Sequence, residues 1–171
     1  TRAAVKRAVR AAHPVYLRFG KAPMLTLHAA HTPFEPGTAI TLREGDDVAF
    51  IATGETVVHC VLAAGVLANE GVACRVLSMH TVKPLDRGAV ERAGRTCAAV
   101  ITVEEHSAHG GLGEACAAVL MQAGVHTRFR MAAIPDADTV TGSQADIFHH
   151  YGLTMEGLAA AARDMLERRS A

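Results

Sequence analysis

Arg18 is the residue of this chain best suited to binding chemistry, because it lies inside an apolar segment, "VYLRF", at residues 15–19. Its guanidinium group is always charged in proteins, and its planar fork can bind two oxygens of a carboxylate or phosphate. A charge in such a segment needs a partner, so Arg18 either forms an ion pair within the protein or binds an anion. Lys21 follows closely and either adds to the same positive charge or is solvated.

A second group of reactive side chains occurs in "EEHSAHGGLG", residues 104–113, which contains Glu104, Glu105, His106 and His109. Carboxylates and imidazoles are ligands of zinc and iron. The spacing of these four residues matches no standard ligand motif, however, and the segment reads as a turn after a strand. We therefore predict no metal site here, and a structural or interfacial role for the histidines.

The glycines of the same segment stand between a predicted strand and a predicted helix, as they do in phosphate-binding turns. The order G-x-G-x-x-G is missing, and Glu114 in the first helical turn would repel a phosphate. The turn "TGET" carries Glu55 in the same place. Both segments are therefore predicted to be tight strand–helix turns, in which glycine allows close approach, and no cofactor-binding residue is assigned.

The four cysteines, Cys60, Cys74, Cys97 and Cys116, are far apart and form no C-x-x-C pair. This spacing gives no support to a zinc ribbon or a thioredoxin-like motif. Each cysteine lies among apolar residues, which predicts buried, reduced thiols in a cytoplasmic protein.

The composition points to a globular α/β protein. Half of the 171 residues are apolar, and the 17 Lys and Arg residues balance the 17 Asp and Glu residues. A net charge of zero gives no reason to expect nucleic acid or an anionic membrane as a partner. The longest apolar runs are too short to span a bilayer, and the first residues lack the apolar core of a secretory signal.

Strands and helices alternate through most of the chain. Strands are predicted at 39–44, 48–54, 72–81, 97–105 and 127–136, and helices at 1–12, 55–69, 83–95, 111–124, 143–152 and 154–169. The short "GDD" between the first two of these strands indicates a hairpin. We therefore expect a three-layer α/β/α domain with a mixed, mostly parallel five-stranded sheet.

The strand predicted at 15–19 does not fit this domain. Only one short helical run precedes it, and a proline-containing linker follows it. We therefore expect residues 1–22 to be the last helix and strand of another domain, whose remaining strands lie upstream.

Five segments, taken together and in this order, resemble the transketolase family: "VYLRFGK", "LREGDDVAFIATG", "VLSMHTVKPLD", "TVEEHSAHGGLG" and "HHYGLTMEGL". The resemblance covers essentially the whole chain. It is strongest to the C-terminal portion of split transketolases, which are made as two subunits. Deoxyxylulose-phosphate synthases and the beta subunits of 2-oxoacid dehydrogenases have looser versions of the same segments.

The resemblance implies a domain organisation and an activity. Residues 1–22 would end a pyrimidine-binding domain, 23–43 would be a linker, and 44–171 would form the transketolase C-terminal domain. The whole enzyme would transfer a two-carbon ketol group between phosphosugars, in the pentose phosphate pathway, with thiamine diphosphate and Mg²⁺. Its partner would be the N-terminal section or subunit, in a homodimer or heterotetramer.

The same resemblance assigns few functional residues to this chain. Arg18 matches an arginine that binds the substrate phosphate. Many relatives have R-x-G-R where this chain has Lys21 as the last residue, which weakens a phosphate role for position 21. The catalytic, cofactor and metal residues of the family have no match here. The segment alone is therefore expected to be inactive and to bind no cofactor, with its C-terminal domain serving structure and dimerisation.

Two alternatives remain open. The chain could be the C-terminal part of a related thiamine enzyme, either a 1-deoxyxylulose-5-phosphate synthase or a 2-oxoacid dehydrogenase beta subunit. It could also be a non-catalytic interaction module, although an unpaired strand carrying Arg18 argues against a self-sufficient module.

Overall fold

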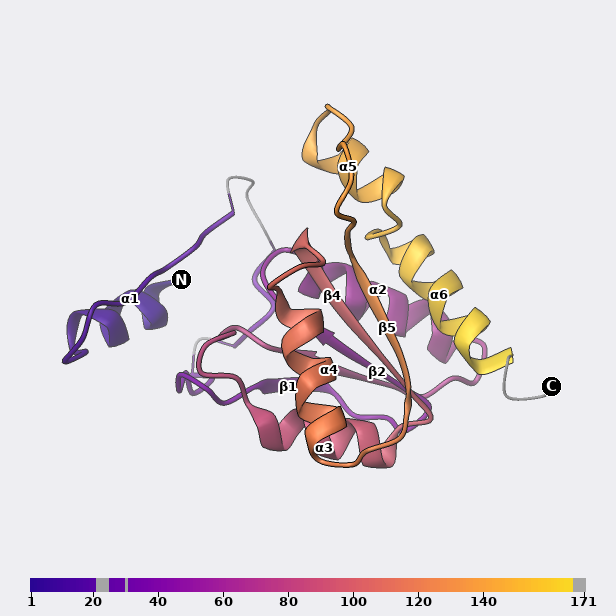
Figure 1. Cartoon of the computed structure of the whole chain (residues 1–171), viewed down its shortest axis with the longest axis horizontal. Coiled ribbons are helices and arrows are strands. Elements are labelled where there is room, and N and C mark those ends of the chain that lie inside the picture. Colours follow the sequence, from indigo (N-terminus) through magenta and orange to yellow (C-terminus); the bar gives the residue numbers. More distant parts are fainter. Residues whose placement is uncertain (21–24, 30, 168–171) are drawn as a thin grey trace.

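A five-stranded sheet forms the centre of the molecule, in a computed structural model that describes residues 1–20, 25–29 and 31–167 (Figure 1). Its strands lie in the order β1-β3-β2-β4-β5. Strands β2, β3, β4 and β5 run parallel, whereas β1 pairs antiparallel with β3. The strands are β1 (Ile40–Arg43), β2 (Val48–Ala52), β3 (Cys74–Ser78), β4 (Ala99–Ser107) and β5 (Arg128–Ile134). The predicted mixed, mostly parallel sheet is confirmed.

Helices cover both faces of the sheet (Figure 1). Helices α2 (Thr56–Ala68) and α6 (Met155–Glu167) enclose one apolar core with the sheet, and α5 (Gln144–His150) adds Phe148 to it. Helices α3 (Arg87–Thr96) and α4 (Leu112–Gln122) enclose a second core on the opposite face. The predicted three-layer arrangement is therefore confirmed. None of the described helices is long and apolar enough to cross a bilayer.

Strand β2 is the most deeply buried element, and all five of its residues have no exposed surface. It pairs in parallel with β3 on one side and with β4 on the other. Its side chains alternate between the two cores, so that Phe50 joins the α2 and α6 side and Ile51 joins the α3 and α4 side. A strand that is buried on both faces explains the unbroken apolar run "VAFIA".

The predicted hairpin of β1 with β2 is wrong, because β3 lies between them. Both edges of β2 are occupied by parallel neighbours, so the connection 44–47 passes the start of β3 instead of turning back. Asp47 N–H donates to the Ala73 carbonyl at 2.9 Å, and Ala73 N–H donates to Asp47 Oδ2 at 2.7 Å. Gly45 is required at this crossing, since a Cβ atom there would lie 2.5 Å from the Ala73 backbone.

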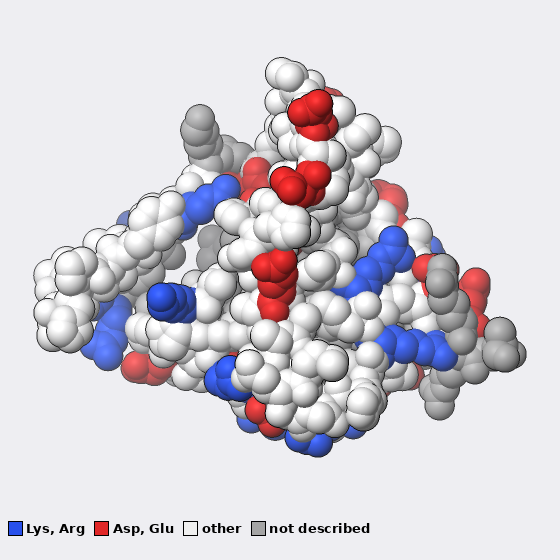
Figure 2. Space-filling view, in the orientation of Figure 1, with Lys and Arg blue, Asp and Glu red and all other residues white. Residues whose placement is uncertain are grey.

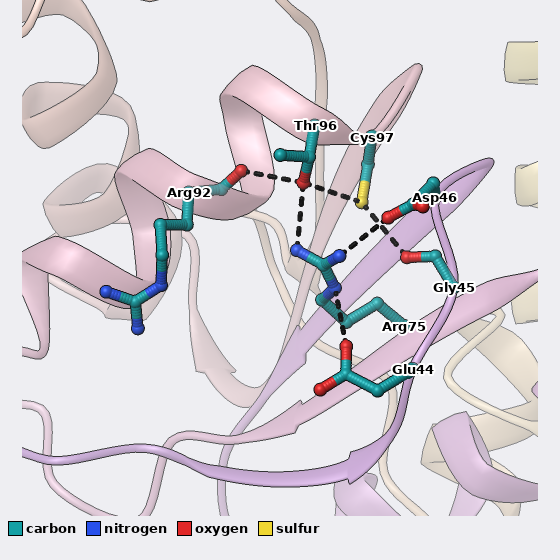
Figure 3. A network of polar contacts seen from close by, with 7 residues as sticks. All are labelled: Glu44, Gly45, Asp46, Arg75, Arg92, Thr96 and Cys97. Atoms are coloured by element: carbon teal, nitrogen blue, oxygen red, sulfur yellow. Dashed lines mark hydrogen bonds and ion pairs between the residues drawn. The ribbon is translucent and has the colours of Figure 1, made fainter.

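A network around Arg75 fixes this crossing at the end of the sheet where the parallel strands begin (Figure 3). Arg75 donates to Asp46 Oδ1 at 2.6 Å and to Thr96 Oγ1 at 2.9 Å, and its Nε lies 3.4 Å from Glu44 Oε2. Figure 3 also shows that the guanidinium of Arg92 points away from this group. The network therefore joins the 44–47 connection, β3 and the end of α3, and its role is structural.

The turn from β4 to α4 is built around a buried carboxylate. Glu104 is only 3 % exposed and accepts hydrogen bonds from the N–H groups of Leu112 and Gly113, each at 2.8 Å. These are free N–H groups of the first helical turn, where a negative charge is favoured. A methyl group at Gly111 would overlap this carboxylate. The predicted tight strand–helix turn is confirmed, and its helical N–H groups bind the protein's own carboxylate.

Helix α1 (Arg2–Val9) and the segment 11–20 extend to one side of the sheet (Figure 1). The segment 11–20 is called here the N-terminal arm. The strand predicted at 15–19 does not form, because no described strand lies beside it to supply hydrogen bonds. Helix α1 buries none of its residues, and Val9 and Tyr16 are 81 % and 87 % exposed. Residues 25–29 and 31–39 contain no helix or strand, and Lys21 lies outside the described residues.

The four cysteines are all free and buried, as predicted. Burial raises the pKa of Cys74 to about 11 and that of Cys116 to about 12, in the second case with the help of the Glu104 charge. Burial also raises the pKa of Cys60 and Cys97. The thiols therefore remain protonated at neutral pH.

Gly111→Ala should destabilise the protein by about 2–3 kcal/mol, because the new methyl group displaces a buried, charged hydrogen-bond acceptor from its donors. The backbone at Gly111 is extended and accepts alanine, so the effect is steric. Gly65→Ala in α2 is the matched control, since nothing lies within 4 Å of its added methyl group, and it should be neutral or slightly stabilising. Chemical denaturation of both variants measures the difference. Equal stability of the Gly111→Ala variant and the wild type would contradict the role of Glu104.

The buried thiols should not react with Ellman's reagent in the native protein at pH 8. A thiol with a pKa of about 11, such as that of Cys74, is thiolate in only about one part in a thousand at this pH. All four thiols should react at once after unfolding in guanidinium chloride. Rapid reaction of any one thiol in the native state would contradict its burial.

Candidate functional site

Arg18 lies beside the end of β4, where its Nη1 donates to the backbone carbonyl of Glu105 at 3.3 Å. The side chain is exposed, and it forms no ion pair with any residue that the structure describes. Its contact with a neutral carbonyl leaves the positive charge uncompensated. Sequence analysis left two roles open for Arg18, an ion pair within the protein and the binding of an anion. The ion pair is not formed among the described residues.

Two glutamates accompany Arg18 at the edge of the sheet where the parallel strands end. Glu55 follows β2, and Glu105 lies near the end of β4, the neighbouring strand. Ligands of parallel sheets characteristically bind outside the carboxyl ends of the strands. The Nε2 atom of Gln144 joins both carboxylates, donating to Glu55 Oε2 and, at 3.1 Å, to Glu105 Oε2.

Gln144 is held in place by the start of helix α5. The preceding Ser143 caps this helix, accepting a hydrogen bond from Asp146 N–H at 3.2 Å. Asp146 in turn accepts bonds from the backbone and the hydroxyl of Ser143, which lowers the pKa of its carboxyl group. This reciprocal capping box fixes the first turn of α5, and with it the direction of the Gln144 side chain.

A small hollow of about 180 Å³ lies next to these groups, between α2 and α5. Glu55, His59, Gln144, Phe148 and Thr154 contribute to its lining. The His59 ring lies edge-on to Phe148, with the ring centres 5.3 Å apart. Burial lowers the pKa of His59, and the charge of Glu156 opposes this shift. A neutral imidazole and an amide can exchange hydrogen bonds with a polar ligand, but the hollow is too small for more than a small fragment.

Two further histidines lie at the end of β3. His28 Nε2 is 3.2 Å from Ser78 Oγ, and His80 stacks on Phe34 with ring centres 4.3 Å apart. Burial lowers the pKa of both imidazoles, which favours their neutral forms. These contacts fasten the segment after the N-terminal arm to the same edge of the sheet.

The side chains of "EEHSAHGGLG" separate into different roles. Glu104 caps α4, and Glu105 bonds to Gln144. His106 is exposed, with Nδ1 3.0 Å from the Ser107 carbonyl. His109 lies between two carboxylates, 3.0 Å from Glu114 Oε1 and 3.6 Å from Asp136 Oδ2. Among the described residues, no three histidine, cysteine or acidic side chains are arranged to bind a metal ion.

Figure 2 shows acidic and basic side chains interspersed on the visible face, without a large area of a single sign. On this face no basic patch typical of a nucleic-acid-binding surface is seen, in agreement with the zero net charge.

Sequence reasoning assigns Arg18 but not its neighbours Glu55, Gly20 and Gln144. The position of Glu55 after "TG" suggests a helix cap, yet its side chain forms no capping bond and instead bonds to Gln144. The only signal for Gln144 is the capping pattern "SQAD", which predicts a helix start and not a contact with two strand ends.

Comparison with known proteins gives the family. The profile of the family "Transketolase, C-terminal domain" matches residues 37–158. The chain is 38% identical over 169 residues to an apulose-4-phosphate transketolase subunit of Phocaeicola vulgatus, covering 98% of this chain and 54% of that protein. It is also 38% identical over 157 residues to the 1-deoxy-D-xylulose-5-phosphate synthase of Symbiobacterium thermophilum, covering 91% of this chain and 24% of that protein.

The solved structures agree with this result. "Split gene transketolase, inactive beta4 tetramer" matches with a TM-score of 0.87 and 36% identity, over 97% of this chain and 53% of that one. A transketolase from Campylobacter jejuni matches with a TM-score of 0.58 and 22% identity, over 81% of this chain and 20% of that one, which shows the shared fold alone. The chain spans about half the length of the apulose-4-phosphate transketolase subunit and of the split-gene transketolase.

The profile match over most of the chain, the identity to a transketolase subunit and the fold shared with a split-gene transketolase agree with one another. This chain belongs to the transketolase family and contains its C-terminal domain.

Proposed function

We propose that this chain is the C-terminal part of an enzyme that transfers a two-carbon ketol group between phosphosugars. Its similarity to an apulose-4-phosphate transketolase subunit and to a split-gene transketolase supports this activity. In this proposal a second, N-terminal subunit or section completes the enzyme, as a homodimer or heterotetramer. The C-terminal domain serves structure and dimerisation.

Arg18 is the substrate-phosphate ligand in this proposal. The observation that carries it is the exposed guanidinium at the sheet edge, bonded only to a backbone carbonyl and without an ion pair among the described residues. A guanidinium in this state can form a two-point, charge-assisted contact with a phosphate. A phosphate group is common to the substrates of the proposed reaction, so one arginine can serve both donor and acceptor.

Residues 1–22 are the end of a pyrimidine-binding domain in this proposal, and 23–43 connect it to the C-terminal domain at 44–171. The apolar side chains of α1 and the N-terminal arm support the assignment, because Val9, Tyr16 and Phe19 are at least half exposed. An isolated helix as short as α1 is only marginally stable in water, so these residues need another surface to pack on. The family profile begins at residue 37, after this region.

The complete enzyme would use thiamine diphosphate and Mg²⁺, but the described residues do not fit either group. They offer no cluster of three metal ligands, and the first N–H groups of α4 are taken by Glu104. In this proposal both groups bind to the parts of the enzyme that this chain does not contain. Its buried, reduced thiols suit a cytoplasmic enzyme.

A 1-deoxy-D-xylulose-5-phosphate synthase is the second candidate. The 38% identity to the enzyme of Symbiobacterium thermophilum favours it, although that protein is about four times longer than the matched region. A donor comparison distinguishes the two: a transketolase uses a ketose phosphate as donor, whereas the synthase uses a 2-oxoacid. Arg18 and its surroundings would serve a phosphate in either case.

Arg18→Ala should raise KM for a phosphorylated ketose roughly 30- to 150-fold in the assembled enzyme. This corresponds to about 2–3 kcal/mol, the cost of losing a charged hydrogen-bonding partner. KM for an unphosphorylated ketose should change little, because no phosphate contact is lost. Steady-state kinetics with both substrates measures the difference.

Arg10→Ala is the matched control, since Arg10 lies just after α1 and its side chain forms no described contact. It should leave both KM values unchanged. An equal rise of KM for the two ketoses in the Arg18→Ala variant would show that Arg18 is structural, and the proposal would fail.

The 171-residue chain alone should show no measurable binding of thiamine diphosphate, with or without Mg²⁺, because the described residues contain no fitting site. Isothermal titration calorimetry tests this, with the assembled enzyme as positive control. Binding to the isolated chain with a micromolar dissociation constant would place a cofactor site here and overturn the assignment.

A further inference from the structure

Gly20 lies directly against the carboxylate of Glu55, two residues after Arg18. A methyl group added to Gly20 would overlap the Oε1, Cδ and Cγ atoms of Glu55. The backbone of Gly20 is not left-handed, so its conformation is open to any residue. A side chain at this position would have to displace either the Glu55 carboxylate or the arm, so the contact with Glu55 sets how closely the N-terminal arm approaches the sheet edge.

Glu55 is an unusual residue for the interior, since glutamate is rarely buried without a full set of partners. Only 7 % of it is exposed. Its Oε2 accepts a bond from Gln144, whereas Oε1, the atom against Gly20, has no hydrogen-bond partner among the described residues. A buried oxygen without a partner costs stability. Glu55 thus lowers the stability of the domain and contacts the N-terminal arm, and a role in holding the arm explains both observations best.

Gln144 controls the charges around Arg18. Its amide group donates to the carboxylates of both Glu55 and Glu105, so each is turned toward α5. Glu105 contacts Arg18 only through its backbone carbonyl. A carboxylate free to swing onto the guanidinium would compete with any anionic ligand. The shared amide thus keeps the charge of Arg18 available.

We propose that Glu55 and Gln144 are positioning residues for Arg18. Glu55 sets the distance between the N-terminal arm and the sheet edge at Gly20. Gln144 keeps the carboxylates of Glu55 and Glu105 away from the guanidinium of Arg18. Arg18 is thereby held in one place with its charge unpaired, ready for a phosphate monoester. This inference rests on the proposed function of Arg18. It explains why the segment "RFG", residues 18–20, contacts the sheet edge at Glu55 and Glu105.

A double-mutant cycle tests the steric half of the proposal. Gly20→Ala should move the N-terminal arm away from the sheet edge, because the new methyl group overlaps Glu55. Glu55→Ala removes every atom of that overlap, so it should make room for the methyl group. The two changes should therefore be coupled: the double variant should behave like Glu55→Ala alone, without an additional effect of the alanine at position 20.

The first readout is the position of the arm in crystal structures of the assembled enzyme, which needs no catalysis. Residues 18–20 should lie against Glu55 in the wild type and should be displaced from the sheet edge in Gly20→Ala. Gly20→Ala and Glu55→Ala should both keep the wild-type positions of β2 and β4, which shows that the domain is folded. An unchanged position of residues 18–20 in Gly20→Ala would overturn the proposal.

The second readout is KM for the phosphorylated ketose in the assembled enzyme. Gly20→Ala, Glu55→Ala and Gln144→Leu should each raise it roughly tenfold, and the Gly20 and Glu55 double variant should match Glu55→Ala. KM for the unphosphorylated ketose should stay unchanged in all four. Gln122→Leu is the matched control for Gln144→Leu, because Gln122 lies on α4 and its side chain bonds, among the described residues, only to Arg87.

The outcomes separate this proposal from the one on which it rests. If Arg18→Ala has no phosphate-specific effect, the proposed function of Arg18 fails. If Arg18→Ala raises KM for the phosphorylated ketose while the Gly20, Glu55 and Gln144 variants do not, only the positioning role fails. Additive effects of Gly20→Ala and Glu55→Ala on KM would also contradict the direct contact.

Discussion

The pairing of β2 with parallel strands on both sides is the constraint on which the rest of the structure depends. Because both neighbours run parallel to β2, each must be reached by a crossover over one face of the sheet. Those crossovers supply α2 and α3, which begin the two apolar cores. The same pairing aligns the ends of β2 and β4, which brings Glu55 and Glu105 to one edge.

The two ends of the sheet differ in their chemistry as a result. At the end where the parallel strands begin, Arg75 has two carboxylates and a hydroxyl as partners, and its charge is compensated. At the opposite edge, Arg18 bonds to a carbonyl, and the nearby carboxylates bond to Gln144. The first arrangement closes the fold, whereas the second leaves a positive charge and a buried carboxylate oxygen without partners among the described residues. This contrast is why we assign binding chemistry to the second end.

Much of the fold could be predicted from the sequence because its local signals agree with the final structure. The apolar run at β2, the left-handed Gly71 after α2 and the Asp86 cap of α3 each mark an element by chemistry that acts within a few residues. The pairing of β1 could not be read in this way. The short "GDD" connection suits a hairpin, and only the competition of β3 and β4 for the edges of β2 excludes it.

The candidate site was less predictable because it, too, depends on contacts between segments that are far apart in the chain. Arg18 stands out locally, as a charge among apolar residues, and the resemblance to transketolases adds its role. Gly20, Glu55 and Gln144 carry no such local signal, because their meaning lies in contacts between segments far apart in the chain. The segment 15–19 shows a further limit of prediction from local sequence. Its residues favour a strand, but no described strand lies beside it to pair with it.

The most direct test of the central claim, that Arg18 binds the substrate phosphate, is a structure of the assembled enzyme with a bound ketose phosphate. We expect the Arg18 guanidinium to contact the phosphate through two nitrogen–oxygen pairs at about 2.7–2.9 Å, with Gly20 still against Glu55. A phosphate bound elsewhere, with Arg18 bonded only to the Glu105 carbonyl or paired with a carboxylate, would contradict the claim.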